Sequence, residues 1–224
     1  MRNISFAFAA MMSVPCLFAV DGVVLINQST VLAAGGFPYQ ITQSGSYRLT
    51  GNLTVPDADT TAIQVTANDV TIDLNGFGII GPTICTGPAG SPVTSCAPLG
   101  RGFGIGSAGS SSDLSVSNGF VRGMGSTGIG IATEGSVQNV RAISNGLNGI
   151  VAYNVSGSVA SFNGQAGIIS NQGTLSGNTT LYNGKVGILS SCPGSVVGNT
   201  ANGNGLQNLS LANSTCTAAN NAAP

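Results

Sequence analysis

Two arginines are the side chains of this chain best placed for ligand chemistry. Arg122 and Arg141 each follow a valine, and they are separated by close to one period of the repeat described below, which stacks them on neighbouring coils. Like charges about 5 Å apart repel each other modestly, and such a pair suits an anionic sugar. Together with Arg101 they form a predicted ligand-binding group. The alternative is that both guanidinium groups extend into solvent or pair with Glu134.

Carboxylates are few in this chain. They are Asp21, Asp57, Asp59, Asp69, Asp73, Asp113 and Glu134. Asp69 and Asp73 are four residues apart, so in one strand they face the same side, an arrangement that a Ca²⁺ site could use. The alternative is a solvated pair, or a turn that Asp69 caps. Both residues are kept as ligand-binding candidates, and no catalytic residue is assigned because no acid, base and stabiliser are placed together.

An aromatic pair recurs with the repeat. Phe162 and Tyr182 each stand directly before an Asn-Gly step and align on neighbouring coils. Two interpretations are open, namely packing along the stack or an exposed platform for the apolar face of a sugar ring. Tyr153 is open to the same two interpretations.

Cysteine usage predicts disulfides. The chain has five Cys and no His. Cys16 falls in the leader described below, and the other four lack the close spacing that a tetrahedral zinc site favours. Among the three possible pairings we prefer Cys85 with Cys96 and Cys192 with Cys216. We expect no metal site and no cofactor.

Charge and the N-terminal residues point to an exported protein. Residues 1–19 carry Arg2 and then an apolar run interrupted by Ser13 and Pro15, which is typical of a signal peptide and short for a membrane-spanning helix. We therefore expect a secreted protein, in the extracellular space, in the periplasm or at the cell surface. A formal net charge of -1 with six Lys plus Arg excludes nucleic acid and anionic membrane as partners.

The composition favours strands and tight turns over helices. Hydrophobic residues make up 42 % of the chain and charged residues only 6 %, while 34 Gly are present. Long helices with ion-paired faces need Glu, Lys, Ala and Leu, which this chain does not supply in quantity. The expected surface is polar and nearly uncharged.

Two sequence markers recur with the same period. Small-apolar steps at Gly128, Gly149, Gly167, Gly187 and Asn208 have spacings of 21, 18, 20 and 21. Asn-Gly steps run in phase at Asn145, Asn163, Asn183 and Asn204. Each period predicts one coil of a solenoid, with the Asn-Gly step supplying the turn of positive φ. We expect four isoleucines to stack in register, namely Ile129, Ile150, Ile168 and Ile188. We expect the asparagines to form a structural ladder without a role in ligand binding.

The period defines one domain with four parts. A capping segment at 20–40 precedes a parallel β-helix at 41–216, which holds about seven coils of about 21 residues. A Pro-rich loop at 82–101, which contains Cys85 and Cys96, should project from the solenoid. Residues 217–224 are expected to be a frayed tail.

One segment resembles a known superfamily. The run from Asp69 to Phe77, Asp-Val-Thr-Ile-Asp-Leu-Asn-Gly-Phe, preceded by Ile-Gln-Val at 63–65, resembles the opening coils of secreted bacterial proteins of the pectin-lyase-like superfamily. The resemblance covers roughly 40–216 and implies an all-β, right-handed parallel β-helix. A likeness to the pectate-cleaving members of this superfamily implies carboxylates that hold Ca²⁺ and an Arg or Lys that abstracts a proton. The polygalacturonase members imply catalytic aspartates with a His, and the lack of His removes that match.

The expected function is non-catalytic. We expect a secreted β-helix that binds carbohydrate, or serves a structural or adhesive role at the cell exterior, with extracellular carbohydrate or matrix as the partner. One alternative is a polysaccharide lyase or glycoside hydrolase acting on acidic polysaccharide, with Ca²⁺ only in the lyase case. The other is an ice-binding solenoid, which needs a regular Thr or Ser ladder, and Thr does not recur in every coil.

Overall fold

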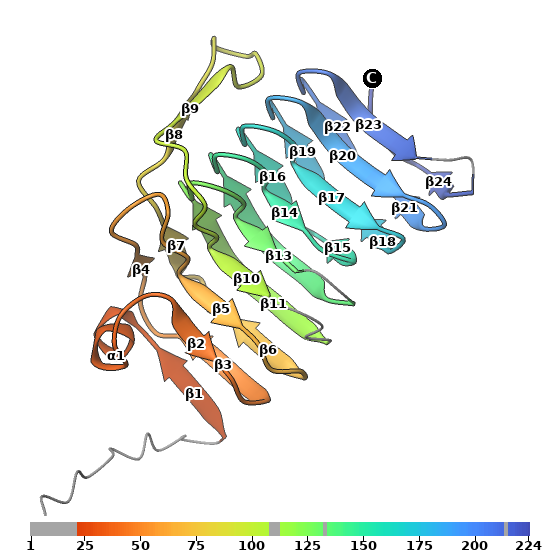
Figure 1. Ribbon diagram of the computed structural model, residues 1–224. Helices are drawn as coiled ribbons and strands as arrows, with labels where there is room; N and C mark the ends of the chain where they lie inside the picture. Colours follow the sequence, from red (N-terminus) through yellow and green to blue (C-terminus); the bar gives the residue numbers. More distant parts are fainter. Residues whose placement is uncertain (1–21, 108–112, 132–133, 213–214) are drawn as a thin grey trace, which may run out of the picture.

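The computed structural model describes residues 22–107, 113–131, 134–212 and 215–224. Over these ranges the chain is a stack of short parallel strands, a β-solenoid, with the short helix α1 (Gln28–Ala33) at its N-terminal end (Figure 1). The predicted all-β solenoid is therefore confirmed. The expected signal peptide at 1–19 lies outside the described residues.

Two parallel sheets form the walls of the solenoid. In the described ranges, sheet A has 14 strands, and its continuous path is β1 (Val23–Ile26), β3 (Gly45–Leu49), β6 (Val70–Asp73), β11 (Leu114–Arg122), β13 (Ser136–Ile143), β15 (Asn154–Ser156), β18 (Thr174–Ser176), β21 (Ser195–Val197) and β24 (Thr217–Ala219). Its side strands are β4 (Leu53–Thr54), β7 (Gly78–Ile80), β16 (Val159–Ser161), β19 (Thr179–Leu181) and β22 (Thr200–Asn202). Sheet B consists of β2 (Tyr39–Ile41), β5 (Ile63–Val65), β10 (Ile105–Ser107), β12 (Ile129–Gly130), β14 (Ile150–Val151), β17 (Ile168–Asn171), β20 (Val186–Ser191) and β23 (Gln207–Ala212).

The stack is longer than predicted because a rung is added at each end. Seven strands of the sheet A path, β3 to β21, lie within 41–216 as expected. At the N-terminal end β1 pairs in parallel with β3. The helix α1 follows β1 and buries Val31 in the core. At the other end β24 pairs with β21, which gives about nine turns.

The tail expected to fray is ordered by this last rung. Asn221 donates its side-chain amide to the carbonyl of Val196 and accepts from the amide of Asn199. The backbone N–H of Ala222 also donates to the carbonyl of Asn199, at 2.8 Å. The prediction was wrong because Asn221 continues a ladder of asparagines that the tail composition does not reveal.

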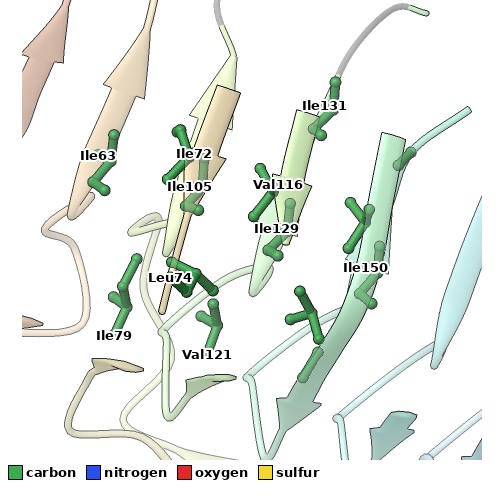
Figure 2. Packing of buried hydrophobic residues seen from close by; sticks show 14 of the residues in the cluster. Ile63, Ile72, Leu74, Ile79, Ile105, Val116, Val121, Ile129, Ile131 and Ile150 are labelled. Atoms are coloured by element: carbon green, nitrogen blue, oxygen red, sulfur yellow. The ribbon is translucent and has the colours of Figure 1, made fainter. Parts of the chain in front are cut away.

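The core is a stack of isoleucines along sheet B. Ile63, Ile105, Ile129, Ile150 and Ile168 pair in register from coil to coil, and Ile188 follows in the same column. All six are fully buried, and Figure 2 shows the first four among the side chains that fill the interior. Burying one isoleucine contributes about 2 kcal/mol, so the stability of each coil depends on its neighbours.

The turns at the Asn-Gly steps differ from the prediction. Positive φ falls on the residue before each Asn, at Ser144 (54°), Phe162 (56°), Tyr182 (54°) and Gly203 (64°). The following glycines are needed for another reason, because a Cβ at Gly164 would collide with the carbonyl oxygen of Gly146 on the preceding coil. The predicted role of these four Asn-Gly steps in the left-handed turn was therefore wrong, whereas the requirement for glycine at close approach is real.

The asparagines form the expected ladder. Asn145 donates its side-chain amide to Oδ1 of Asn163, which donates in turn to Asn183, each at 2.9 Å. Asn183 donates to Asn204 at 2.9 Å. A second ladder, through Asn178, Asn199 and Asn221, runs along another edge of the stack.

The Pro-rich loop at 82–101 is anchored along the turns rather than projecting freely. Its strands β8 (Ile84–Thr86) and β9 (Ser95–Ala97) pair as an antiparallel hairpin closed by the Cys85–Cys96 disulfide. Sγ of Cys85 lies 3.5 Å from the carbonyl oxygen of Asn145. The N–H of Val93 donates to the carbonyl of Tyr182 at 3.0 Å, two coils further along. The second disulfide joins Cys192 and Cys216, so both preferred pairings are present.

Candidate ligand-binding site

Arg122 and Arg141 do not share one row of the stack. Strands β11 and β13 pair so that Arg141 stands opposite Phe120 and Arg122 stands opposite Ile143. The expected register was wrong because this coil is longer than the separation of the two arginines in the sequence. Both side chains still point outward from sheet A, because Phe120 and Arg122 are two residues apart in the same strand.

The two arginines meet at the ring of Phe120. The guanidinium carbon of Arg122 lies 6.0 Å from the ring centroid and that of Arg141 lies 5.5 Å from it. Each cation is attracted by the negative face of the ring, which offsets part of the repulsion between the charges. The ring itself lies against Gly78 of β7, where a Cβ would collide with it. Glycine at 78 therefore allows the ring to lie close to the sheet.

A cavity adjoins this cluster. It has a volume of about 370 Å³ and is lined by residues 80–84, Arg122, Gly123, Ile143 and Ser144. The start of the Pro-rich loop is held against β11 because Gly81 donates to the carbonyl of Arg122 and Thr83 to that of Gly123. The cavity thus has an apolar wall from the loop and a cationic group from sheet A. We call Phe120, Arg122 and Arg141, with this cavity, the arginine site.

Both guanidinium groups are available for an anion. Across the described residues the only ion pair joins Arg48 and Asp73, at 3.1 Å. The alternative pairing of Arg122 or Arg141 with Glu134 does not occur there. Both arginines are exposed on the outer face of the sheet. A ligand carboxylate would therefore meet guanidinium groups that no protein carboxylate neutralises.

The two aspartates predicted to share a face do not do so. Asp69 stands before β6 with a φ of 54°, so the alternation of a strand does not extend to it. Asp73 pairs with Arg48 and accepts from the backbone N–H of Asn75 at 2.9 Å. Asp113 occupies the same place before β11 as Asp69 before β6. Over the described residues no three His, Cys, Asp or Glu side chains are grouped to hold a metal.

Arg101 belongs to a different neighbourhood. Its backbone N–H donates to the carboxylate of Asp59 at 3.0 Å, in a turn organised by Asp57. The hydroxyl of Thr60 donates to Asp57 at 2.7 Å and lowers the pKa of that carboxyl. Arg101 does not line the cavity. Of the five predicted ligand-binding residues, the structure brings together Arg122 and Arg141 and leaves Asp69, Asp73 and Arg101 outside the arginine site.

Sequence reasoning missed Phe120 and the cavity wall. Phe120 was visible only as the end of an Asn-Gly-Phe phrase repeated from 75–77. A repeat alignment that pairs Ser115 with Ser136 would have placed it opposite Arg141. The wall at 80–84 depends on how the loop folds back, which the period cannot indicate.

The aromatic pair is stacked between neighbouring coils. The ring centroids of Phe162 and Tyr182 are 5.5 Å apart with an angle of 27° between the planes. Phe162 is 41 % exposed. These residues follow β16 and β19, whose strands continue the part of sheet A that carries Arg141.

A column of small polar residues follows the outer face of sheet A. From β3 to β24 one outward position carries a hydroxyl or an amide in each successive strand of the path: Ser46, Thr71, Ser115, Ser136, Asn154, Thr174, Ser195 and Thr217. Ser136 donates to Ser115 at 3.1 Å. The recurrence of Thr alone did not predict this column, because its positions are occupied by Ser, Thr and Asn.

Comparisons with known proteins give a likeness of fold. No family model matches the chain, and no curated protein matches it. Among solved structures, the crystal structure of the periplasmic alginate epimerase AlgG is similar with a TM-score of 0.45 and 13 % identity, over 90 % of this chain and 72 % of that one. In the described part of the chain no helix is long and apolar enough to cross a membrane.

Proposed function

We propose that this chain is an extracytoplasmic, non-catalytic β-solenoid that binds acidic carbohydrate at the arginine site. The observation that carries the proposal is the convergence of Arg122 and Arg141 on Phe120, without a protein carboxylate to pair with them in the described residues. Two disulfides support a location in an oxidising compartment, outside the cytoplasm.

The chemistry of the site suits a uronic acid or a similar anionic sugar. A guanidinium group binds a carboxylate through two parallel hydrogen bonds, which a neutral sugar cannot reproduce. The Phe120 ring and the apolar wall at 80–84 can contact the C–H groups of the sugar ring. Because the chain has only six cationic side chains, binding depends on these local contacts and not on a general positive field.

The proposal is tested by calorimetric titration with polygalacturonate and alginate oligosaccharides. Arg122→Ala and Arg141→Ala should each weaken binding about tenfold or more, because a hydrogen bond to a charged group contributes about 1.5–3 kcal/mol. Arg101→Ala is the matched control and should leave the affinity unchanged. Equal losses from all three variants, or no binding by the wild type, would contradict the proposed site. Release of unsaturated or new reducing ends, with or without Ca²⁺, would make the protein a lyase or hydrolase.

The second candidate function is ice binding at the polar column of sheet A. The recurrence of a hydroxyl or amide in eight successive strands of the sheet favours it, because parallel strands repeat about every 4.8 Å and set the groups in a regular row. Ice-recrystallisation assays test it. Ser136→Tyr should abolish activity, and Ser210→Tyr on sheet B should not. A wild type that leaves ice growth unaltered excludes this candidate.

A further inference from the structure

We infer that Phe162 and Tyr182 extend the arginine site into a track that binds an acidic glycan chain across several coils. This inference rests on the proposed function and names its ligand more closely, as a polymer rather than a single sugar. Four observations support it: the register of the coils, the backbone conformation of the two residues, the arrangement of their rings and the position of the Pro-rich loop.

The register places the aromatic pair in line with the cavity. Ile143 pairs with Ser161 and Ser161 pairs with Leu181, so Ser144, Phe162 and Tyr182 occupy the same position on three successive coils. Ser144 lines the cavity of the arginine site. Since coils repeat about every 4.8 Å, Phe162 lies one coil beyond the cavity and Tyr182 two coils beyond it.

The backbone at this position is unfavourable for aromatic residues. Phe162 and Tyr182 have φ values of 56° and 54°, and the equivalent positions on neighbouring coils are Gly123, Ser144 and Gly203. A bulky residue with positive φ costs about 1 kcal/mol or more relative to glycine. Core burial does not offset that cost for Phe162, a residue that is 41 % exposed. Such strain in an exposed aromatic residue motivates a hypothesis of function.

The rings leave one aromatic face directed towards the cavity. A Cβ at Gly203 would lie 2.6 Å from Cε1 of Tyr182, so the Tyr182 ring covers the small residue on the following coil. Phe162 stacks on Tyr182, with ring centroids 5.5 Å apart. On the other side of Phe162, the equivalent position on the preceding coil holds only Ser144. The apolar face of a pyranose could therefore pack against Phe162 while the next sugar reaches the cavity.

The Pro-rich loop borders this track. Val93 donates to the carbonyl of Tyr182, and Cys96 lies close to Gly164, two residues after Phe162. The Cys85–Cys96 disulfide closes this hairpin, and the hydrogen bond of Val93 holds it beside the aromatic pair. The occupant that fits is an extended acidic chain, because its carboxylates match Arg122 and Arg141 and its ring faces match the aromatic pair.

The test compares oligogalacturonates of increasing length by calorimetric titration. In the wild type the affinity should rise with length until the oligosaccharide spans the track. Phe162→Ser copies the residue of the preceding coil. This variant and Tyr182→Ser should each lower the affinity for long oligosaccharides about five- to tenfold and leave the affinity for the shortest oligosaccharide unchanged. Leu206→Ser, at an exposed apolar residue of a later turn, is the matched control.

The outcomes separate the two proposals. One outcome is that Arg122→Ala weakens binding of the shortest oligosaccharide, while in Phe162→Ser and Tyr182→Ser the affinity still rises with length as in the wild type. In that case the track is excluded and the arginine site stands. If the wild type binds no acidic oligosaccharide, the proposed function fails and the track fails with it.

Thermal unfolding of Phe162→Ser should show no loss of stability from strain, because serine already occupies the same backbone conformation at Ser144.

Discussion

The asparagine ladder allows a quantitative test of how the stack is held together. Asn163 is fully buried, and its Oδ1 accepts from both the backbone N–H and the side-chain amide of Asn145, at 3.0 and 2.9 Å. Its own amide donates to the carbonyl of Ala142 and to Oδ1 of Asn183, at 3.1 and 2.9 Å. Asn163→Ala would remove all four hydrogen bonds and leave two buried donors on Asn145 without an acceptor.

The expected loss follows from those two donors. A buried polar group left without a partner costs about 1–3 kcal/mol, so the two donors together should lower the free energy of unfolding of Asn163→Ala by about 2–6 kcal/mol. This is a large share of the stability of a typical domain, about 5–15 kcal/mol, so the variant should be measured by urea unfolding at low temperature. Asn204→Ala, at a partly buried residue that continues the same ladder to Asn208, should cost less.

The control for this prediction is Asn202→Ala, at an exposed residue of β22. It should change the free energy of unfolding by less than about 0.5 kcal/mol. If Asn163→Ala costs no more than Asn202→Ala, the buried ladder contributes little and the reasoning is refuted. Folded Asn163→Ala should bind acidic glycans as the wild type does, because the ladder is inside the stack. Weaker binding would give the asparagines a role in ligand recognition that their burial argues against.

Two further predictions concern the turns. Gly164→Ala should destabilise the protein by several kcal/mol in thermal unfolding, because its Cβ would collide with the carbonyl of Gly146. Gly177 has open space around it but a φ of 62°, so Gly177→Ala should cost only about 1 kcal/mol. Thr60→Val should raise the pKa of Asp57 towards its ordinary value in an NMR titration, because the hydroxyl that lowers it is lost. The lowered pKa stabilises the fold above the unfolded-state pKa of Asp57, and this contribution disappears as pH falls through the folded-state pKa. An unchanged Asp57 titration in Thr60→Val would refute the second prediction.

The repeat made the fold predictable because its markers have fixed structural roles. Asn163 must recur to continue the ladder, and Gly164 must recur because no Cβ fits between the coils. Both are visible as letters in the sequence. The assignment of positive φ to the wrong residue has a physical reason too: Phe162 and Tyr182 take this conformation although their residue types disfavour it.

The candidate site was only half predictable because it depends on register. Coil length varies along the stack, so an alignment on the two Val-Arg phrases is shifted by two positions from the true pairing. That error placed the arginines on top of each other and hid Phe120 between them. Asp69 and Asp73 were chosen for their spacing of four residues and Arg101 for its charge at the loop exit, and the structure places none of the three at the arginine site. In the structure Asp69 precedes its strand and Asp73 is already paired with Arg48.

The scarcity of charge strengthens the argument for ligand binding at the arginine site. Only 6 % of the residues are charged, and most of the outer face of sheet A carries uncharged polar groups. Stacking alone does not require two cations on one ring, because the row of Arg141 continues with Val159 in β16 and then Thr179 in β19. Two guanidinium groups near one ring still repel each other, and the ring offsets only part of that repulsion. An anion bound between them would remove the remainder, so the unliganded protein keeps two adjacent positive charges at this site. Binding should therefore weaken steeply with ionic strength, although the protein as a whole has almost no net charge.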